Sequence, residues 1–265
     1  MLTIENTNVI GFEDAIRGMR NPLNSWEKSD SSFNHEDGEY HDICGNIGPS
    51  LEDAGTIILG QNDKDLMKRL ASAGKDHAKY RRYIVVYADL IAPLYWWKEY
   101  DTYKVGTVAN SCSTMHKIQA KEFTLDDFSH EHLFSADDID RDPDSGAIPD
   151  AMKLENIPTL AAVLVDGSEA YYTPYGFLAM TCDVLNHFRE LYLKTKDKRY
   201  WWQMIQLLPS SYNQRRTVML NYEVLANIYH SRRNHKLDCW HTFCDWIESL
   251  PESWIITGED ANEQN

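Results

Sequence analysis

The spacing of hydrophobic and polar positions along the chain predicts a mixed α/β fold. Residues 2–11 are expected to form a strand, and the amphipathic segment 12–21 is expected to form a helix. Apolar residues at helical spacing predict another helix over 63–74. The clearest strand is 83–91, which is nearly continuous in β-branched and other apolar residues. That pattern is typical of a strand at the centre of a sheet.

Further helices are predicted in the remainder of the chain. Pro93 stands where a helix can begin, and residues 94–104 continue it. A longer amphipathic helix is expected over 175–195. After Pro209 and a polar loop through Gln214, the spacing predicts one more helix with an apolar side. That side carries Val218, Val224, Leu225, Ile228 and Tyr229.

Polar stretches separate these elements. Residues 25–50 are polar and predict a long surface loop. The segment 122–157 is strongly acidic, which predicts an exposed insertion near 122–172. Because the composition changes little elsewhere, we expect one domain over residues 1–256. The closing residues 257–265 are expected to be disordered.

Two polar residues interrupt the apolar side of the helix expected after Gln214. At 100° per residue, Asn221 and Arg232 lie within ~20° of each other in the middle of that side. Burial of an amide and a guanidinium is unfavourable unless another group pairs with them. Two interpretations remain open: an internal carboxylate pairs with Arg232, or the inner end of this helix is a ligand site.

The same segment resembles the signature of a known family. The run Leu207–Pro209 is followed, without a gap in spacing, by Asn221, Asn227 and Arg232, as in the C-terminal signature of the flavin-dependent thymidylate synthases. The resemblance implies an α/β fold in which long helices flank a sheet. It also implies that Arg232 contacts the uracil ring of a nucleotide, and that the two asparagines help to hold FAD. A histidine of the family is matched by His77, which is expected to contact the cofactor.

The resemblance further implies a reaction and its partners. These enzymes carry a methylene group from methylenetetrahydrofolate to C5 of the uracil in dUMP, while reduced flavin supplies a hydride. An arginine against the uracil polarises the ring, so no protein nucleophile is needed there and Arg232 is expected to be catalytic. FAD, a pyrimidine nucleotide, NADPH and methylenetetrahydrofolate are the expected cofactors and substrates. Active sites of the family form between subunits, so a homotetramer is expected.

A second signature of the family is largely replaced in this chain. Its R-H-R motif falls on residues 102–104, where Lys104 keeps a positive charge and is the remaining candidate for a cofactor contact. The missing arginines are mostly those that hold phosphates. Their place could be taken by other arginines, each of which is otherwise a solvated surface residue: Arg81, Arg82, Arg215, Arg216 and Arg233.

Cys112 takes the position of a serine in the same motif. It is a candidate catalytic nucleophile, because a thiolate can add to C6 of a pyrimidine. The alternative is a small buried cysteine in a tight loop. Two hypotheses about function therefore stand. Retention of Asn221, Asn227 and Arg232 favours a flavin-dependent transferase that acts on a pyrimidine nucleotide. Loss of the R-H-R motif favours a non-catalytic nucleotide-binding or interaction module.

A metal site is a further alternative near the C-terminus. His235 and Cys239 would share a helix face, and His230, His241 and Cys244 lie close to them in the sequence. Cys244, however, falls on the apolar side of its helix, where a metal ligand is not expected. We therefore expect no metal site.

Composition and charge argue against several classes of protein. With 43% hydrophobic and 25% charged residues, the 265-residue chain has the composition of a globular protein. No apolar run approaches the ~20 residues of a membrane span, and the N-terminal segment lacks the features of a secretion signal. Five cysteines without paired spacing favour a reducing, cytoplasmic location. The net charge of −15 disfavours general binding to nucleic-acid backbones.

Overall fold

The computed structural model describes residues 2–34, 40–42, 47–48, 57–135, 160–163 and 169–258. Their contacts group the chain into two compact units, and the boundary between the units runs through strands and one helix. Unit 1 takes in the described residues of 91–98 and 111–215. Unit 2 takes in those of 2–90, 99–110 and 216–265. None of the described helices is long and apolar enough to cross a membrane.

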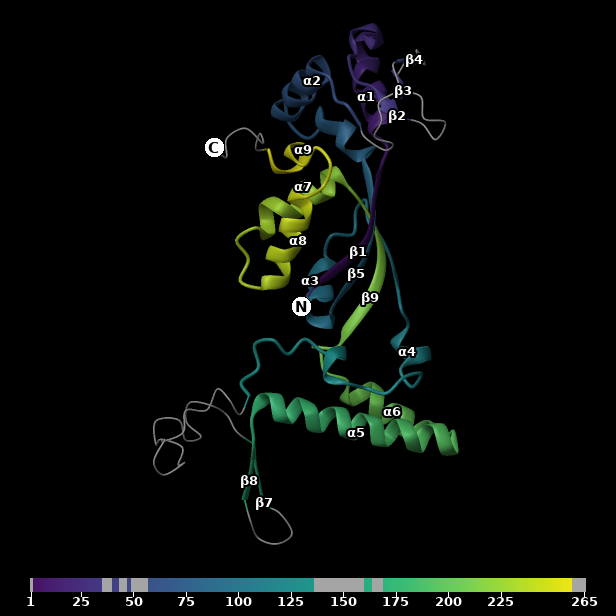
Figure 1. Ribbon diagram of the computed structural model, residues 1–265, viewed down its shortest axis with the longest axis vertical. Coiled ribbons are helices and arrows are strands. Elements are labelled where there is room, and N and C mark those ends of the chain that lie inside the picture. The colour runs from purple at the N-terminus through teal and green to yellow at the C-terminus, as the bar shows by residue number, and fades with distance from the viewer. Residues whose placement is uncertain are drawn as a thin grey trace, which may run out of the picture. The chain divides into compact units, whose positions relative to one another are not determined.

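Figure 1 labels most of the helices and strands that follow one another along the chain. The strands are β1 (Thr3–Ile10), β2 (Phe33–Asn34), β3 (Tyr40–His41), β4 (Ile47–Gly48), β5 (Val85–Pro93), β6 (Val108–Ser111), β7 (Leu160–Val163), β8 (Glu169–Tyr172) and β9 (Asn213–Asn221). The α-helices are α1 (Phe12–Arg20), α2 (Gln61–Ser72), α3 (Leu94–Tyr100), α4 (Thr114–Lys117), α5 (Pro174–Thr195), α6 (Lys198–Leu207), α7 (Tyr222–Arg232), α8 (Asp238–Glu248) and α9 (Trp254–Thr257). Short 3-10 turns are η1 (Asn21–Leu23), η2 (Trp26–Lys28), η3 (Ala78–Arg82) and η4 (Leu125–Asp127).

The main sheet has the strand order β1-β5-β9-β6, so β5 and β9 are its central strands. β5 and β9 are antiparallel. At one end the N–H of Tyr222 donates to the carbonyl of Ile84 at 3.0 Å, and at the other the N–H of Leu94 donates to the carbonyl of Tyr212 at 3.0 Å. Residue numbers therefore rise along one strand while they fall along the other, as in an antiparallel pair. Two smaller antiparallel sheets pair β2-β3-β4 and β7-β8.

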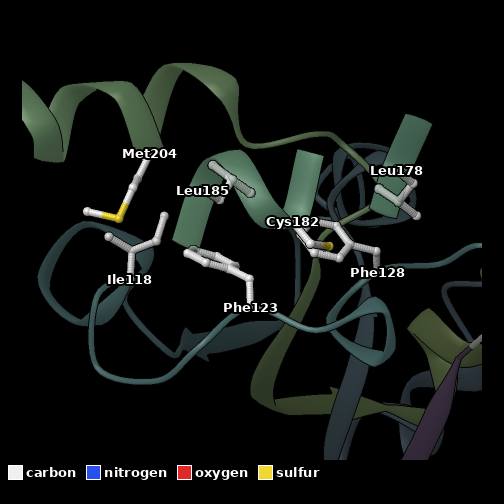
Figure 2. Close-up of a cluster of buried hydrophobic side chains, with 7 residues drawn as sticks. All are labelled: Ile118, Phe123, Phe128, Leu178, Cys182, Leu185 and Met204. Carbon is white, nitrogen blue, oxygen red and sulfur yellow. The ribbon is translucent and has the colours of Figure 1, made fainter. Parts of the chain in front are cut away.

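A hydrophobic cluster forms the core of the helical part of unit 1. Helix α5 presents Leu178, Cys182 and Leu185 at helical spacing, and Leu185 is fully buried. Figure 2 shows these side chains facing residues of the segment 118–128 and one residue of α6. The other members of the cluster are Ile118, Phe123, Phe128 and Met204. Burial of these apolar side chains is the main term that stabilises this part of unit 1.

Unit 2 is built around the turn η3, which packs against α1, α2 and α7. The rings of Phe12 and Tyr222 meet edge to face, with centroids 5.7 Å apart. The chain passes from β1 into α1 through Gly11, whose φ is +93°. A Cβ at this position would lie 2.1 Å from the carbonyl oxygen of Tyr83, so no residue larger than glycine fits the turn. Burial raises the pKa of Tyr222, whose hydroxyl donates to the carbonyl of Pro251.

Most of the expected elements are confirmed. The first strand and first helix are β1 and α1, and the strand over 83–91 is the central strand β5. The helices expected over 63–74, 94–104 and 175–195 are α2, α3 and α5. Helix α3 ends at Tyr100, before the expected end, and α5 matches the expected helix within one residue.

The predictions of a polar loop through Gln214 and of a following helix that already includes Val218 were wrong. Residues 213–221 form strand β9, and α7 begins only at Tyr222. Burial alternates toward the end of β9, where Val218 and Leu220 are buried and the residues between and beside them are less so. This period of two belongs to a strand with one face covered. Val218 is therefore a residue of β9 and does not belong to the apolar side of α7.

Two expected loops fall partly outside the described residues. Where the segment 25–50 is described, the expected surface loop also holds η2 and the two-residue strands β2, β3 and β4. At the start of the acidic segment, Phe123 and Phe128 are buried in unit 1. Residues 136–159 and 259–265 lie outside the described residues. The exposed insertion, the disordered tail and the single domain therefore stay predictions.

Candidate functional site

Most of the predicted site residues gather around helix α7 in unit 2. Asn221 stands immediately before the helix, and Asn227 and Arg232 lie within it. The loop that follows α3 passes along the same helix. Its Gly106 lies against Asn221, and its Tyr103 contacts Arg232. Helix α7 and this loop together form the frame of the candidate site.

Asn221 caps the N-terminus of α7. Its side-chain oxygen accepts the backbone N–H of Val224 at 3.0 Å, which is the bond expected of an N-cap asparagine. The amide nitrogen lies close to Gly106, because a Cβ built on that glycine would be 2.9 Å from Nδ2. Gly106 has a φ of +77°, so a larger residue there would be strained as well as crowded. The prediction that Asn221 lies on the apolar stripe of a helix was wrong, because the helix starts after it.

Arg232 is held at the end of α7 by an internal carboxylate. Its Nη1 donates to Oε2 of Glu99 at 2.8 Å, and its Nε donates to the hydroxyl of Tyr103 at 2.9 Å. The guanidinium carbon lies 4.8 Å from the centre of the Trp240 ring, within the range of a cation–π interaction. Glu99 is therefore the internal carboxylate that one of the two interpretations of the sequence requires.

One oxygen of Glu99 has donors on several sides. Besides Arg232, the indole N–H of Trp240 donates to Oε2 at 3.0 Å, and Nε2 of His235 lies 3.5 Å from the same oxygen. Nδ1 of His235 accepts the N–H of Leu237 at 3.2 Å. Because Nδ1 accepts this bond, Nε2 is the ring nitrogen that can donate toward Glu99. His235 and Trp240 also pack edge to face, with ring centroids 6.4 Å apart.

The charge of Arg232 is thus balanced within unit 2. The side chain of Arg232 is 19% exposed and that of Glu99 is 34% exposed, which places the pair at the boundary between core and solvent. A pair in this position contributes less to stability than a fully buried one. Chemically, the arrangement provides a guanidinium whose orientation is fixed and whose remaining exposed surface can meet an acceptor.

A second group of polar side chains lies beside the middle of α7. Nζ of Lys75 donates to Oδ1 of Asn227 at 3.0 Å. His77 follows two residues later in the same turn and is exposed. The structure therefore places the predicted residues His77 and Asn227 in one surface region of unit 2. Lys104 is exposed in the loop that passes along α7.

Cys112 belongs to unit 1, where it is exposed and lines a small cavity. Its backbone N–H donates to the carbonyl of Arg215 at 2.9 Å. The cavity has a volume of about 260 Å³, and its wall also includes Lys117, Asp127 and Asn213. The alternative that Cys112 is a buried cysteine was wrong, because the side chain reaches solvent.

Two properties of this cavity suit a polar ligand. The side-chain oxygen of Asn213 is buried and has no hydrogen-bond partner among the described residues. An unsatisfied buried acceptor costs about 1–3 kcal/mol, so a donor on a ligand would be bound favourably. The wall carries three cations and two carboxylates, Lys117, Lys121, Arg215, Asp126 and Asp127, and Lys121 pairs with Asp127. One positive charge is therefore in excess.

The other described cysteines differ from Cys112 in their surroundings. Cys182, Cys239 and Cys244 are buried. Burial raises the pKa of the Cys182 and Cys244 thiols to about 11. Both therefore stay protonated at neutral pH, and a protonated thiol is a poor nucleophile. Among the cysteines that the structure describes, Cys112 alone is exposed enough to react.

The residues considered for a metal site do not form one. Within the described ranges, no group of three or more His, Cys, Asp or Glu side chains is placed to hold a metal ion. Cys239 and Cys244 are buried in the apolar face of α8, and His235 faces Glu99.

The partners of Arg232 were missed from the sequence. Glu99 is 133 residues away from Arg232 along the chain, so no local pattern in the sequence joins the two. The available signal was local: Glu99 directly precedes the buried Tyr100 in a helix rich in aromatic residues. An acidic residue at the margin of such a face is a candidate partner for a buried cation.

Comparisons with known proteins give the fold class. No protein-family model and no curated protein matches this sequence. Solved structures do match it. A flavin-dependent thymidylate synthase, ThyX, from Helicobacter pylori in complex with FAD and dUMP has a TM-score of 0.57 at 14% identity, over 96% of this chain and 98% of that one. A second ThyX structure from the same organism, also with FAD and dUMP, has a TM-score of 0.56 at 13% identity, over 97% and 98%.

A third similar structure is a UMP/dUMP methylase, PolB, from Streptomyces cacaoi, bound with 5-Br UMP. It has a TM-score of 0.51 at 11% identity, over 96% of this chain and 94% of that one. The chain therefore has the α/β fold of the flavin-dependent thymidylate synthases, and the expected fold class is confirmed. At these identities the likeness concerns the fold, so the roles of the site residues rest on this chain's own geometry.

The pairing of Arg232 with Glu99 predicts a measurable coupling. We expect Arg232→Met to lower the free energy of unfolding by about 1–3 kcal/mol, because Glu99 loses its charged donor. In a double-mutant cycle with Glu99→Gln, the double variant should lose at least about 0.5 kcal/mol less than the sum of the two single losses. Urea unfolding of the four proteins measures both quantities.

Arg233 provides a matched control for this cycle. It follows Arg232 directly, and its pairs with Asp245 and Glu248 are exposed, with side-chain exposures of 38% for Arg233, 65% for Asp245 and 39% for Glu248. Arg233→Met should therefore change the free energy of unfolding by less than about 1 kcal/mol. If Arg232→Met is no more destabilising than Arg233→Met, the Glu99 cluster does not hold this part of unit 2 together.

Thiol accessibility gives a second prediction. At pH 8 the folded protein should lose one rapidly reacting thiol, measured with a chromogenic disulfide reagent, when Cys112 is changed to Ser. Cys182 and Cys244 should react only on unfolding, because burial holds each pKa at about 11 and excludes the reagent. An unchanged rapid phase in Cys112→Ser would show that Cys112 is inaccessible.

Proposed function

We propose that this chain binds a pyrimidine nucleotide and FAD and transfers a one-carbon unit to the pyrimidine of dUMP or a related nucleotide. The observation that carries the proposal is the Cys112 cavity, where an exposed thiol, the unpartnered acceptor of Asn213 and the cations of Lys117 and Arg215 line one space. A pyrimidine nucleotide has the complementary groups: an electrophilic C6, a ring N–H and a phosphate. The fold likeness to proteins crystallised with dUMP or 5-Br UMP supports this ligand class.

Cys112 is the nucleophile in this proposal. Its thiolate would bond to C6 of the pyrimidine, and the electron pair of the C5=C6 double bond would move toward the C4 carbonyl oxygen. C5 then becomes nucleophilic and can take the one-carbon unit. Tetrahydrofolate would then leave as the C5 proton is lost. The hydride that reduced FAD would supply converts the transferred methylene into a methyl group, and departure of the thiolate restores the ring. Asn213 would hold the ring by accepting its N3–H.

Lys117 and Arg215 would bind the nucleotide phosphate. The family arginines that bind phosphates are missing from the R-H-R positions, so these two cations would supply the charge-assisted contacts in their place. Arginine suits a bidentate contact and lysine a point contact, so both modes are available at this cavity.

The α7 region has donors that fit FAD. Lys75 donates to the half-buried Asn227, His77 is exposed in the same turn as Lys75, and Lys104 is exposed in the loop along the helix. Cations and amide donors are what flavin phosphates and the polar edge of the flavin ring require. Arg232, oriented by Glu99, would donate to a carbonyl oxygen of a bound ring. When bound and reduced, FAD supplies a hydride; NADPH as reductant and methylenetetrahydrofolate as one-carbon donor belong to the same proposal.

A second candidate function is a non-catalytic nucleotide-binding or interaction module. The observation that favours it is the engagement of Arg232 by Glu99 and Tyr103, which occupies two of the donor positions of its guanidinium. The two candidates differ in one outcome, since both bind nucleotide but only the first one turns it over.

Ligand binding and turnover separate these candidates. The purified protein supplemented with FAD should retain a yellow, stoichiometric complex, and dUMP should raise its melting temperature. Cys112→Ser should bind dUMP with an unchanged Kd and transfer no one-carbon unit, because only the nucleophile is removed. Lys117→Gln should weaken dUMP about tenfold and leave deoxyuridine unaffected, because deoxyuridine has no phosphate.

The nucleotide dAMP is the matched control ligand, since it keeps the phosphate and replaces the pyrimidine. Equal stabilisation by dAMP and dUMP would contradict a pyrimidine site. Binding of FAD and dUMP without turnover in the wild type would support the non-catalytic candidate. A protein that binds neither ligand would rule out the transferase and a nucleotide-binding module, and would leave the interaction module.

The predicted homotetramer has its own test. If the active sites form between subunits, the protein should elute at four times the 30.7 kDa mass of one chain, as measured by light scattering. FAD titration at decreasing protein concentration should lose stoichiometric binding as the tetramer dissociates. A monomer that still binds FAD would contradict a shared site.

A further inference from the structure

A basic cavity in unit 2 plays no part in the function proposed above. It has a volume of about 690 Å³ and lies between the end of α1, the turn η2 and one side of α2. The described residues that line it are Arg20, Lys28, Asn62, Asp65, Lys68 and Arg69. Four of these six carry a positive charge and one a negative charge. In a chain with a net charge of −15, such a concentration of cations is a local exception.

Arg20 is the buried member of this wall, with 4% exposure. Its Nε donates to Oδ1 of Asp63 at 2.7 Å, and its Nη1 donates to the carbonyl of Ser25 at 3.1 Å. Its third nitrogen, Nη2, is buried and has no hydrogen-bond partner within the described ranges. A buried guanidinium nitrogen without an acceptor is unfavourable, so an acceptor supplied by a ligand would be favoured here.

The carboxylate of Asp63 cannot serve that nitrogen as well. Its second oxygen, Oδ2, accepts from the hydroxyl of Ser29 at 2.7 Å, from that of Ser31 at 2.6 Å and from the N–H of Asp30 at 3.2 Å. Asp63 is fully buried and saturated with donors, so it neutralises Arg20 from one side only. The guanidinium is held rigidly by this contact, which is the condition for a pre-organised anion contact.

The exposed part of the wall carries three cations and one carboxylate. Lys28, Lys68 and Arg69 line the cavity together with Asp65, whose Oδ1 accepts a hydrogen bond from the side-chain amide of Gln61 at 2.7 Å. Lys68 also lies over the ring of Trp254, 5.5 Å from its centre, a contact that leaves its charge in place.

The N-terminal amides of α2 are already used. Asp30 accepts the N–H groups of Asn62 and Asp63 at 3.0 and 3.2 Å. The helix end is therefore capped, and the attraction for an anion comes from the side chains.

We propose that this cavity binds the phosphate groups of a small polyanionic molecule. Oxygens of a phosphate would approach Arg20 from the cavity side, while Lys28 and Arg69 neutralise the outer charge. The volume exceeds that of a single phosphate ion, so a molecule with two or more phosphate groups fits better than inorganic phosphate. This site shares no residue with the Cys112 cavity or with the α7 region, so it goes beyond the function proposed above.

Calorimetric titration of the full-length protein with inorganic pyrophosphate tests the proposal. We expect saturable 1:1 binding per chain, with Kd raised about tenfold in Lys28→Gln and again in Arg69→Gln, as expected for the loss of one charge-assisted contact each. Asp65→Asn should lower Kd, because it removes the one negative charge of the wall. ATP and citrate serve as comparison ligands: tighter binding of ATP would add a nucleotide contact, and equal binding of citrate would overturn the preference for phosphate.

Lys64→Gln is the matched control, because Lys64 lies on α2 but does not line the cavity. It removes the same charge and should leave Kd unchanged. Arg20→Lys keeps the charge beside Asp63 but removes the unpartnered nitrogen, so it should weaken pyrophosphate while the protein stays folded. The proposal is overturned if pyrophosphate does not bind, or if Lys28→Gln and Lys64→Gln have the same effect. Lys117→Gln should leave pyrophosphate binding unchanged, which separates this site from the nucleotide site in the Cys112 cavity.

Discussion

One carboxylate oxygen organises the C-terminal half of unit 2. Oε2 of Glu99 accepts from Arg232 at the end of α7 and from Trp240 in α8, and it faces His235 in the segment between them. Each donor needs this acceptor, and the carboxylate needs the donors because it is partly removed from water. The end of α3, the last turn of α7 and the first turn of α8 are therefore fixed with respect to one another. The loop that carries Lys104 leaves α3 from this fixed point.

This arrangement joins a structural role and a candidate binding role in one side chain. Arg232 can serve a ligand only through the part of its guanidinium that Glu99 and Tyr103 leave unused. A guanidinium held in this way loses little conformational entropy when it meets a ligand, which favours binding. The same contacts limit its polarising power, because Glu99 already neutralises its charge. The proposed reaction therefore gives Arg232 a binding role, and its nucleophile is the exposed thiol of Cys112.

The sequence was sufficient where one local pattern decided the structure. β5 is a long β-branched run, and α5 is a long amphipathic one, so neither depends on distant residues for its type. β9 was misread because Val218 fits both the period of a strand and the stripe of the following helix. Because the helix was predicted to start too early, Asn221 was wrongly placed on its apolar side. An asparagine before an apolar helical turn is also an N-cap signal. Glu99 could not be assigned to Arg232 at all, since a contact across 133 residues exists only once the chain is folded.

Net charge and local charge have different consequences for the ligands of this protein. At physiological ionic strength the Debye length is about 8 Å, so the charge of −15 acts weakly on a small anion that is already inside a cavity. Inside a cavity the nearest side chains determine the attraction for an anion. Both the Cys112 cavity and the basic cavity lined by Arg20 have cations in their walls. A long polyanion such as a nucleic acid would extend over many Debye lengths and meet the acidic surface as well. The same chain can therefore favour small phosphate compounds and disfavour nucleic-acid backbones, with no conflict between the two.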